Sequence, residues 1–382
     1  MQQTGELNTT TTTTTTTKHS CSTENQPLRN KHVRDLVADK RRLVEVPYTA
    51  SLAHMMNALV ANRVVAAPVA APPGHWIGAG GSMIMESDKQ TGVARKHYIG
   101  MVTMLDILAH IAGDDDKMDG SDGSDLDQKM AVPVSSIIGH CLEGLSLWTL
   151  NPNTSMIDCM EVFSKGIHRA LVPVDSHMEN MSGVELVESA SSYRMLTQMD
   201  MVRFLKEHAF EIGDIISRTV SELGAVTENV FAITHSTKVI EAINCMRAAM
   251  LNAVPIVRVV TDAPEQEYHK QLINGRGRKL IGTFSATDLR GCHLATLQSW
   301  LPFSALDFTE SVSNSPLYAA SDSPRELVSC LPESSLAEVI DKVVTKHVHR
   351  VWVVDRHGLL VGLVSITDII RVLRLSLLSE PR

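Results

Sequence analysis

One short pattern occurs four times along this chain, and it constrains the fold more than any other feature. Each copy opens with apolar residues at spacings of three and four, which predicts an amphipathic helix. A short apolar run follows, which predicts a buried strand. After a hairpin of variable length, a second strand ends on a serine or threonine three positions before an aspartate. Four copies of one unit predict four equivalent packed repeats that differ mainly in their loops.

The same kinds of residue mark the helices, strands and closing pairs of the four copies. The apolar positions of the expected helices are Leu52, Met55, Met56 and Leu59; Met156, Met160 and Phe163; Val239, Ile243, Met246 and Met250; and Leu336, Ile340 and Val343. The expected strands read VVAAPV, ALVPVD, AVPIV and VWVVD. The closing pairs are Thr103 with Asp106, Thr197 with Asp200, Ser285 with Asp288, and Ser365 with Asp368.

Each closing pair lies where a strand is expected to end and a helix to begin. A capping box explains the pair structurally: the hydroxyl accepts from a free helix amide and the aspartate answers the amide of the cap, for about 1 kcal/mol. The same helix start also offers free amides to a phosphate, while the aspartate can accept two hydrogen bonds from a ribose diol. Both interpretations can hold together, so the pattern predicts nucleotide-binding positions without showing that any is filled.

Charge and hydropathy exclude several classes of partner. The net charge of −8 gives the chain no overall positive field for a phosphate backbone or an anionic membrane. No run of about 18 apolar residues occurs, and the threonine-rich N-terminus lacks the apolar core of a secretory signal. We therefore expect no nucleic-acid or membrane partner, and a cytoplasmic location that can extend to the nucleus.

The repeats and their composition predict the boundaries of the chain's segments. Residues 1–30, with nine consecutive threonines, cannot bury enough apolar surface to order themselves and predict a disordered tail. The first repeat is expected over residues 31–112, with a glycine-rich hairpin insertion that contains GHWIGAGGS. An acidic linker over 113–129 precedes the other repeats, which are expected over 130–210, 211–293 and 294–382.

Signatures of catalysis are absent from the sequence. It contains no kinase loop, nucleophile elbow, dinucleotide fingerprint or CxxC pair. The two histidines of HVH, His347 and His349, have no third ligand nearby, so we expect no metal site. Little sequence remains outside the repeats to build a catalytic domain, and we expect no catalytic residue and no enzyme activity.

These motifs resemble a known family. The [ST]xxD closure after a glycine-containing strand is similar to the CBS (cystathionine-beta-synthase) repeat. The segments NTSMIDCMEVFSKGIHRALVPVD and SSLAEVIDKVVTKHVHRVWVVD look like the second and fourth repeats of the gamma regulatory subunits of AMP-activated and sucrose-non-fermenting-type kinases. With its threonine-rich tail and acidic linker, the chain looks most like the plant members. The resemblance runs from about Val33 to Leu375. It implies an α/β (α+β) fold of tandem βαββα repeats, paired into two Bateman modules that form a disc around an adenine-nucleotide cleft.

The resemblance also implies residues that approach phosphate groups. In that family a His-Arg pair at the start of the central strand faces the nucleotide, and the matching residues are His168 with Arg169 and His349 with Arg350. A solvated strand end is the alternative for each pair. The first repeat departs from the family, because Val65 stands where a basic residue is common. The second repeat reads HRALVPVD, one residue longer than HRVWVVD, which calls for a bulge or a shift of register.

Two functions follow from the resemblance. The first is a non-catalytic gamma-like subunit that binds a protein kinase catalytic (alpha) subunit and a beta scaffold subunit, needs no cofactor, and takes AMP, ADP or ATP as a regulatory ligand. The second is a CBS-repeat scaffold with decayed nucleotide sites, which Val65 and the extra residue of the second repeat favour. An enzyme regulated by its own CBS module would need a catalytic domain, and the flanks are too short for one.

Overall fold

The computed structural model describes ten stretches of the chain: 28–71, 76–77, 83–84, 97–112, 124–140, 147–174, 192–259, 270–289, 299–314 and 326–379. Of the expected tail, only η1 (Leu28–Asn30) belongs to the described residues. The glycine-rich insertion lies outside them except for β3 (Trp76–Ile77) and β4 (Met83–Ile84), which pair antiparallel. The expected acidic linker lies outside them up to residue 123, and its last part is the start of α4 (Ser124–Ala131).

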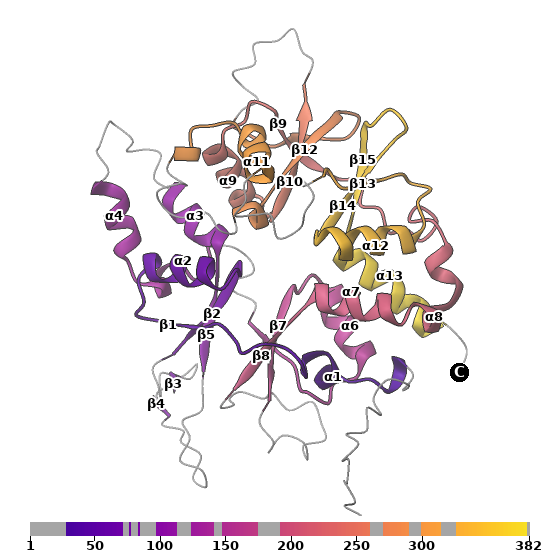
Figure 1. Cartoon of the computed structure of the whole chain (residues 1–382), viewed down its shortest axis with the longest axis horizontal. Helices are drawn as coiled ribbons and strands as arrows, with labels where there is room; N and C mark the ends of the chain where they lie inside the picture. The colour runs from indigo at the N-terminus through magenta and orange to yellow at the C-terminus, as the bar shows by residue number, and fades with distance from the viewer. Residues whose placement is uncertain are drawn as a thin grey trace, which may run out of the picture.

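Four copies of one βαββα unit form the described molecule, as the sequence predicts (Figure 1). Repeat 1 consists of β1 (Val46–Pro47), α2 (Leu52–Ala61), β2 (Ala66–Ala70), β5 (Tyr98–Thr103) and α3 (Met104–Ala112). Repeat 2 consists of β6 (Trp148–Thr149), α6 (Met156–Ser164), β7 (Arg169–Pro173), β8 (Tyr193–Thr197) and α7 (Gln198–Glu207). Repeat 3 consists of β9 (Phe231–Thr234), α9 (Val239–Ala248), β10 (Ala253–Arg258), β12 (Lys279–Ser285) and the 3-10 helix η7 (Ala286–Leu289). Repeat 4 consists of β13 (Ser329–Cys330), α12 (Leu336–Lys346), β14 (Arg350–Val354), β15 (Leu360–Ser365) and α13 (Ile366–Ser379).

Each repeat has its own small sheet with the same strand pairing. The short first strand runs parallel to the central strand, and the central strand pairs antiparallel with the last. Repeat 3 adds β11 (Ile273–Asn274) at the free side of β9. One face of the central strand packs against helices and the other against the sheet of the neighbouring repeat, so its apolar run is buried, as the continuous hydrophobic sequence predicts.

The register places the four closing hydroxyl residues at equivalent corners. The paired residues at these corners are Ala66 with Thr103, Arg169 with Thr197, Ala253 with Ser285, and Arg350 with Ser365. The expected shift at the start of the second central strand does not occur, because Arg169 and Arg350 have equivalent partners. The extra residue is accommodated further along: β7 pairs regularly to Pro173, whereas β14 has a register irregularity after Val353.

The first helix of every repeat ends in the same left-handed turn. The residues with positive φ are Arg63 (52°), Gly166 (90°), Met250 (54°) and His347 (52°). Each lies three positions before the first residue of its central strand, so the turn sets the direction in which that strand leaves the helix. Met250 therefore lies beyond α9 and is 65% exposed, and its predicted place on the apolar helix face is wrong.

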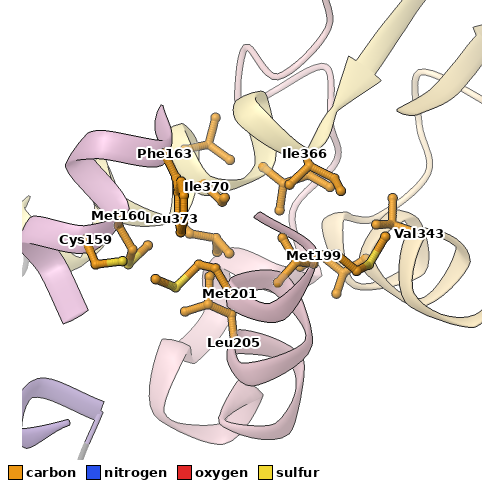
Figure 2. Close-up of a cluster of buried hydrophobic side chains, with 14 of the residues drawn as sticks. Cys159, Met160, Phe163, Met199, Met201, Leu205, Val343, Ile366, Ile370 and Leu373 are labelled. Atoms are coloured by element: carbon orange, nitrogen blue, oxygen red, sulfur yellow. The ribbon is translucent and has the colours of Figure 1, made fainter. Parts of the chain in front are cut away.

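Sheets and helices pair the repeats in two different ways. Around Leu171 and Tyr193, the sheets of repeats 1 and 2 pack together, with the Tyr193 ring edge-on to Tyr98 at 5.4 Å. The sheets of repeats 3 and 4 meet around Trp352. Helices join repeat 1 to repeat 3 in one core and repeat 2 to repeat 4 in another; Figure 2 shows the second, where Phe163 and Ile370 belong to different repeats. Two sheet-paired modules thus stack through their helices, and Figure 1 shows the four repeats around one ring.

Segments next to the repeats cross over within each module. The N-cap of the first helix of each repeat forms an isolated bridge with such a segment: Ser155 with His32, Ser51 with Pro133, Ser335 with Thr219, and Lys238 with Ser304. Accordingly, α1 (Val33–Val37) packs with repeat 2, α4 and η3 (Val134–Ile137) with repeat 1, η5 (Gly213–Ser217) with repeat 4, and α11 (Ala305–Asn314) with repeat 3. Between α7 and η5, α8 (Ala209–Ile212) packs against both. The boundaries drawn from the repeat pattern stay predictions.

Candidate functional site

Each closing aspartate accepts from its own helix start at all four corners, and the full reciprocal capping box forms at three of them. The carboxylate of each aspartate accepts from the backbone amide of the hydroxyl residue three positions earlier, at 2.7, 2.8, 2.8 and 3.1 Å in repeats 1 to 4. In repeats 1, 2 and 4 the hydroxyl accepts in return from the aspartate amide, at 3.1, 3.3 and 3.2 Å. The capping-box prediction is confirmed there. In repeat 3 the Ser285 hydroxyl instead contacts the Asn252 carbonyl at 3.4 Å.

Burial separates the four aspartates into two groups. Asp106 is 0% exposed and Asp288 is 6% exposed, so the corners of repeats 1 and 3 are enclosed. The side chains of Asp200 and Asp368 are each 14% exposed. Oδ2 of both accepts from its own cap, and a guanidinium three residues further along the helix approaches Oδ1: Arg203 at 3.7 Å and Arg371 at 3.3 Å. Repeats 2 and 4 therefore present the more accessible acidic corners, each with a cation beside it.

The His-Arg pairs lie at the start of the central strands, as predicted. The carbonyl oxygens of His168 and His349 each accept the backbone amide that follows the closing hydroxyl residue, at 3.1 Å in both repeats. Nη1 of Arg350 donates to the Ala253 carbonyl at 3.0 Å and so links the corner of repeat 4 to that of repeat 3. The contact of the two His-Arg pairs with phosphate stays a prediction.

Direct contacts bring the corners of different repeats together. The buried side-chain amide of Gln198, the first residue of α7, donates to Thr367 Oγ1 at 2.9 Å and to the Phe163 carbonyl at 2.9 Å. This contact joins the helix starts of repeats 2 and 4. In the other half of the molecule, α3 packs against η7 and joins those of repeats 1 and 3. The equivalent corners of the four repeats are thus held in one region.

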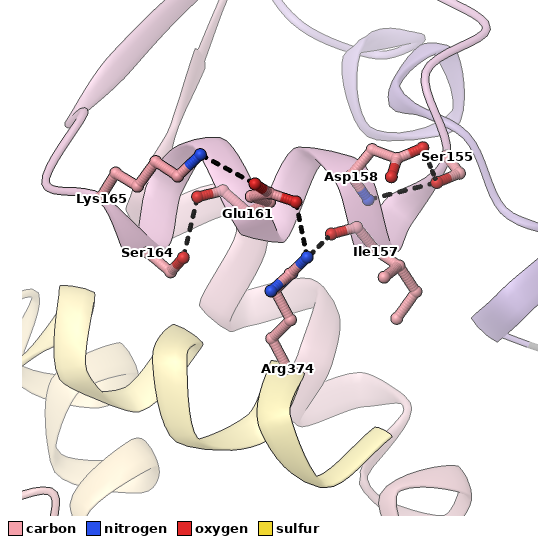
Figure 3. Close-up of polar contacts among 7 residues, drawn as sticks. All are labelled: Ser155, Ile157, Asp158, Glu161, Ser164, Lys165 and Arg374. Atoms are coloured by element: carbon pink, nitrogen blue, oxygen red, sulfur yellow. Dashed lines mark hydrogen bonds and ion pairs between the residues drawn. The ribbon is translucent and has the colours of Figure 1, made fainter. Parts of the chain in front are cut away.

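Further along the helices, charged side chains tie repeat 2 to repeat 4. In Figure 3 the Arg374 guanidinium of α13 lies between the Glu161 carboxylate, at 2.6 Å, and the Ile157 carbonyl of α6, at 3.3 Å. Lys165 approaches the same carboxylate at 2.8 Å. Lys165 first, and then Arg374, hold the pKa of Glu161 below its ordinary value. The junction is therefore built for an ionised Glu161.

Burial controls the titration of other groups in the described chain. It raises the pKa of the Cys159 thiol to about 12 and that of the Cys330 thiol to about 11. Burial, with the acceptor Glu45, also raises the pKa of Tyr98, whose hydroxyl donates to that carboxylate between the sheets of repeats 1 and 2. Both thiols are thus held in the neutral form at physiological pH, which suits packing rather than reaction.

One basic side chain at these corners was missed by sequence reasoning. Nζ of Lys40 lies 2.6 Å from Asp200 Oδ2, although Lys40 precedes repeat 1 and Asp200 belongs to repeat 2. The two residues are separated by 160 positions, and no periodicity links them. Only the crossing of the N-terminal segment onto repeat 2 brings the ammonium to this corner.

A metal site and a membrane-spanning helix find no support in the residues that the structure describes. Within them, no group of three or more histidine, cysteine, aspartate or glutamate side chains is arranged to hold a metal ion. The helices of the same stretches include none with the length and apolar character needed to cross a bilayer.

Comparison with known proteins gives consistent matches. The family model of the CBS domain matches residues 323–375, which include most of repeat 4. Two Arabidopsis thaliana proteins named "SNF1-related protein kinase regulatory subunit gamma-like", PV42a and PV42b, are similar over almost their whole length. PV42a is 63% identical over 93% of this chain and 97% of its own, and PV42b is 60% identical over 91% and 95%.

The fold has a solved counterpart. A Methanocaldococcus jannaschii protein, whose description relates it to the gamma subunit of AMP-activated protein kinase, superimposes with a TM-score of 0.54. The match covers 89% of this chain and 99% of the archaeal chain at 16% identity. This likeness supports the fold described above. At 16% identity it is evidence for the fold alone.

Proposed function

This chain belongs to the family of gamma-like regulatory subunits of SNF1-related protein kinases, and we propose that it is the non-catalytic regulatory subunit of a serine/threonine kinase complex. The observation that carries the proposal is the 63% identity to a protein of that name over 97% of the relative's length. The expected partners are a kinase catalytic (alpha) subunit and a beta scaffold subunit. The expected location is the cytoplasm, extending to the nucleus.

We further propose that the corner of repeat 4 takes an adenine nucleotide, AMP, ADP or ATP. Asp368 is the more accessible kind of corner aspartate, and its carboxylate can accept from a ribose diol. The positive end of the dipole of α13, a helix of 14 residues, lies at this corner and favours an anion there. His349 and Arg350 lie beside that corner at the start of β14, and Arg350 supplies positive charge for phosphate groups.

A scaffold with decayed nucleotide sites is the competing function, and one observation favours it. The four corner aspartates all accept hydrogen bonds from their own helix starts, so a structural role accounts for each of them without a ligand. Both functions share the kinase partners and differ only in the response to nucleotide. A ligand regulates the complex only as far as its affinity differs between the conformations of the complex.

Calorimetric titration of the purified chain with AMP, ADP and ATP separates the two functions. We expect binding of at least one of them, and we expect Asp368→Asn and Arg350→Ala each to weaken it at least about tenfold, or about 1.4 kcal/mol. Asp355→Asn is the matched control, because Asp355 lies in the β14–β15 turn of the same repeat and accepts from the amides of that turn. Binding that survives both variants would place the nucleotide elsewhere, and an absence of binding would favour the scaffold.

The kinase partnership needs its own test. Co-expression with a plant SNF1-related kinase catalytic subunit and a beta subunit, followed by purification on a tag carried by this chain, should yield a complex that survives gel filtration. Recovery of this chain alone would contradict the proposed subunit role whatever the result of the nucleotide titration.

A further inference from the structure

The acidic corner of repeat 2 contains a cation supplied from outside that repeat. The Lys40 ammonium lies 2.6 Å from Asp200 Oδ2, and the same oxygen accepts from the amide and the hydroxyl of Thr197 at 2.8 and 2.6 Å. Arg203 approaches the other oxygen at 3.7 Å. Both carboxylate oxygens are therefore directed at groups of the protein itself.

The N-terminal segment holds Lys40 firmly in this place. Val33 and Val37 of α1 are 0% and 2% exposed in the core of repeats 2 and 4. Three residues after Val37, the Lys40 amide donates to the Val37 carbonyl at 3.1 Å, and the Lys40 carbonyl accepts from Nε of Arg194 on β8 at 2.9 Å. The backbone of Lys40 is thus fixed at both its donor and its acceptor, and its side chain is only 26% exposed.

The corresponding segment of the other module delivers no such cation. His32 bridges Ser155 and Thr219 bridges Ser335, so Thr227, eight residues after Thr219, corresponds to Lys40. Thr227 pairs through its backbone with Leu363 of β15, at 2.8 and 2.9 Å. A threonine side chain is too short and uncharged to act as a lysine does. Asp368 therefore lies in a corner like that of Asp200, with an equivalent arginine but without an ammonium from this segment.

We propose that Lys40 is the residue that decides which acidic corner a nucleotide can occupy: it closes the corner of repeat 2 to a ribose diol and leaves that of repeat 4 open. Both aspartates accept from their own caps, but a ribose diol at Asp200 would also have to compete with Lys40 for the carboxylate. Displacing Lys40 would strand a partly buried ammonium beside the incoming ligand, which disfavours binding. This inference rests on the proposed function, in which a corner aspartate accepts from the ribose.

The test compares the number of nucleotides bound per chain before and after the charge is removed. Lys40→Met keeps the length and apolar stem of the side chain, and we expect it to bind one additional nucleotide per chain in calorimetric titration. The added site should disappear in the double variant Lys40→Met with Asp200→Asn, while the site that depends on Asp368 stays. Lys40→Arg keeps the positive charge and should keep the wild-type stoichiometry.

Lys206→Met is the matched control, because Lys206 also forms an ion pair at 2.6 Å in repeat 2 but with Asp341 of α12 at the surface. An added site in Lys206→Met or in Lys40→Arg would overturn the inference, since neither variant removes the charge at Asp200. Retained binding at Asp368 in Lys40→Met shows that the variant is folded.

The outcomes for the inference and for the proposed nucleotide site are distinct. If the wild-type chain binds nucleotide and Lys40→Met binds no more than it, the role of Lys40 is wrong and the site of repeat 4 stands. If only Lys40→Met binds, through Asp200, the site of repeat 4 is wrong and the role of Lys40 stands. If neither chain binds, both are overturned.

Discussion

The side-chain amide of Gln198 donates to the Thr367 hydroxyl at 2.9 Å, which joins the first residue of α7 to the first turn of α13. The two residues are 169 positions apart and belong to repeats of different modules. The same amide nitrogen donates to the carbonyl of Phe163 at 2.9 Å, and Gln198 is 3% exposed. One buried amide thus links the candidate corners of repeats 2 and 4 directly.

Replacement of Gln198 by leucine should destabilise this junction. The Thr367 hydroxyl would lose its donor, whereas the Phe163 carbonyl would keep the Gly166 amide at 3.2 Å, and a buried group without a partner costs about 1–3 kcal/mol. Urea unfolding followed by far-UV circular dichroism measures the change in the free energy of unfolding. Gln128→Leu, at an exposed position of α4, should shift it by less than about 0.5 kcal/mol. Equal effects of the two variants would contradict the structural role of Gln198.

The closing aspartates should differ in their contribution to stability. In Asp106→Ala, the Thr103 amide loses its acceptor where water cannot enter, and we expect a cost of about 2–3 kcal/mol. In Asp368→Ala the Ser365 amide can be solvated, and we expect about 1 kcal/mol, the usual loss for a helix cap. Thermal and urea unfolding of both variants gives the comparison. A smaller loss for Asp106→Ala than for Asp368→Ala would show that burial does not control these caps.

Local patterns predicted the repeat and its corners well. Thr103 with Asp106 and Ser365 with Asp368 are three residues apart, so the sequence alone contains the whole interaction. The apolar spacing of α12 likewise reflects the face that it buries, with Leu336, Ile340 and Val343 in one core. Interactions of this short range depend on the helix geometry and not on the tertiary arrangement.

Contacts between distant segments could not be predicted in this way. Lys40 reaches Asp200 because α1 crosses onto repeat 2, and the sequence around Lys40 contains no sign of that crossing. Met250 fits the helical spacing of α9, but the helix ends before it in a left-handed turn. The same turn lies at the equivalent position of every repeat. Periodicity marks which residues are apolar; it does not say where a helix ends or which repeat a flanking segment joins.

Acidification should loosen the tie between repeats 2 and 4. The pKa of Glu161 is lowered in the folded chain, first by Lys165 and then by Arg374. A lowered folded-state pKa means that the stabilisation is present above the unfolded value, about 4.3, and is lost as the pH falls through the folded value. We expect urea midpoints to fall less steeply below about pH 5 in Glu161→Gln than in the wild-type chain.

Salt supplies the control for this pH dependence. The side chains of Glu161 and Arg374 are partly exposed, so 1 M NaCl, with a Debye length of about 3 Å, should weaken their attraction. The urea midpoints of the wild-type and Glu161→Gln chains should then differ less in their pH dependence. A Glu161→Gln chain with the wild-type pH dependence at low salt would show that Arg374 is held by the Ile157 carbonyl alone.

The left-handed turns predict two substitutions of opposite effect. Gly166 has a φ of 90°, and Gly166→Ala should cost about 1–2 kcal/mol because a Cβ is disfavoured there. Met250 occupies the same place in repeat 3 with a φ of 54° and a 65% exposed side chain, so Met250→Gly should raise the free energy of unfolding by up to about 1 kcal/mol. Ala248→Gly, two residues earlier at the exposed last residue of α9, is the matched control and should lower it, because glycine gains freedom in the unfolded chain where no left-handed conformation is relieved. Urea unfolding measures all three, and a loss of stability in Met250→Gly as large as that in Ala248→Gly would mean that Met250 is not held in the left-handed conformation.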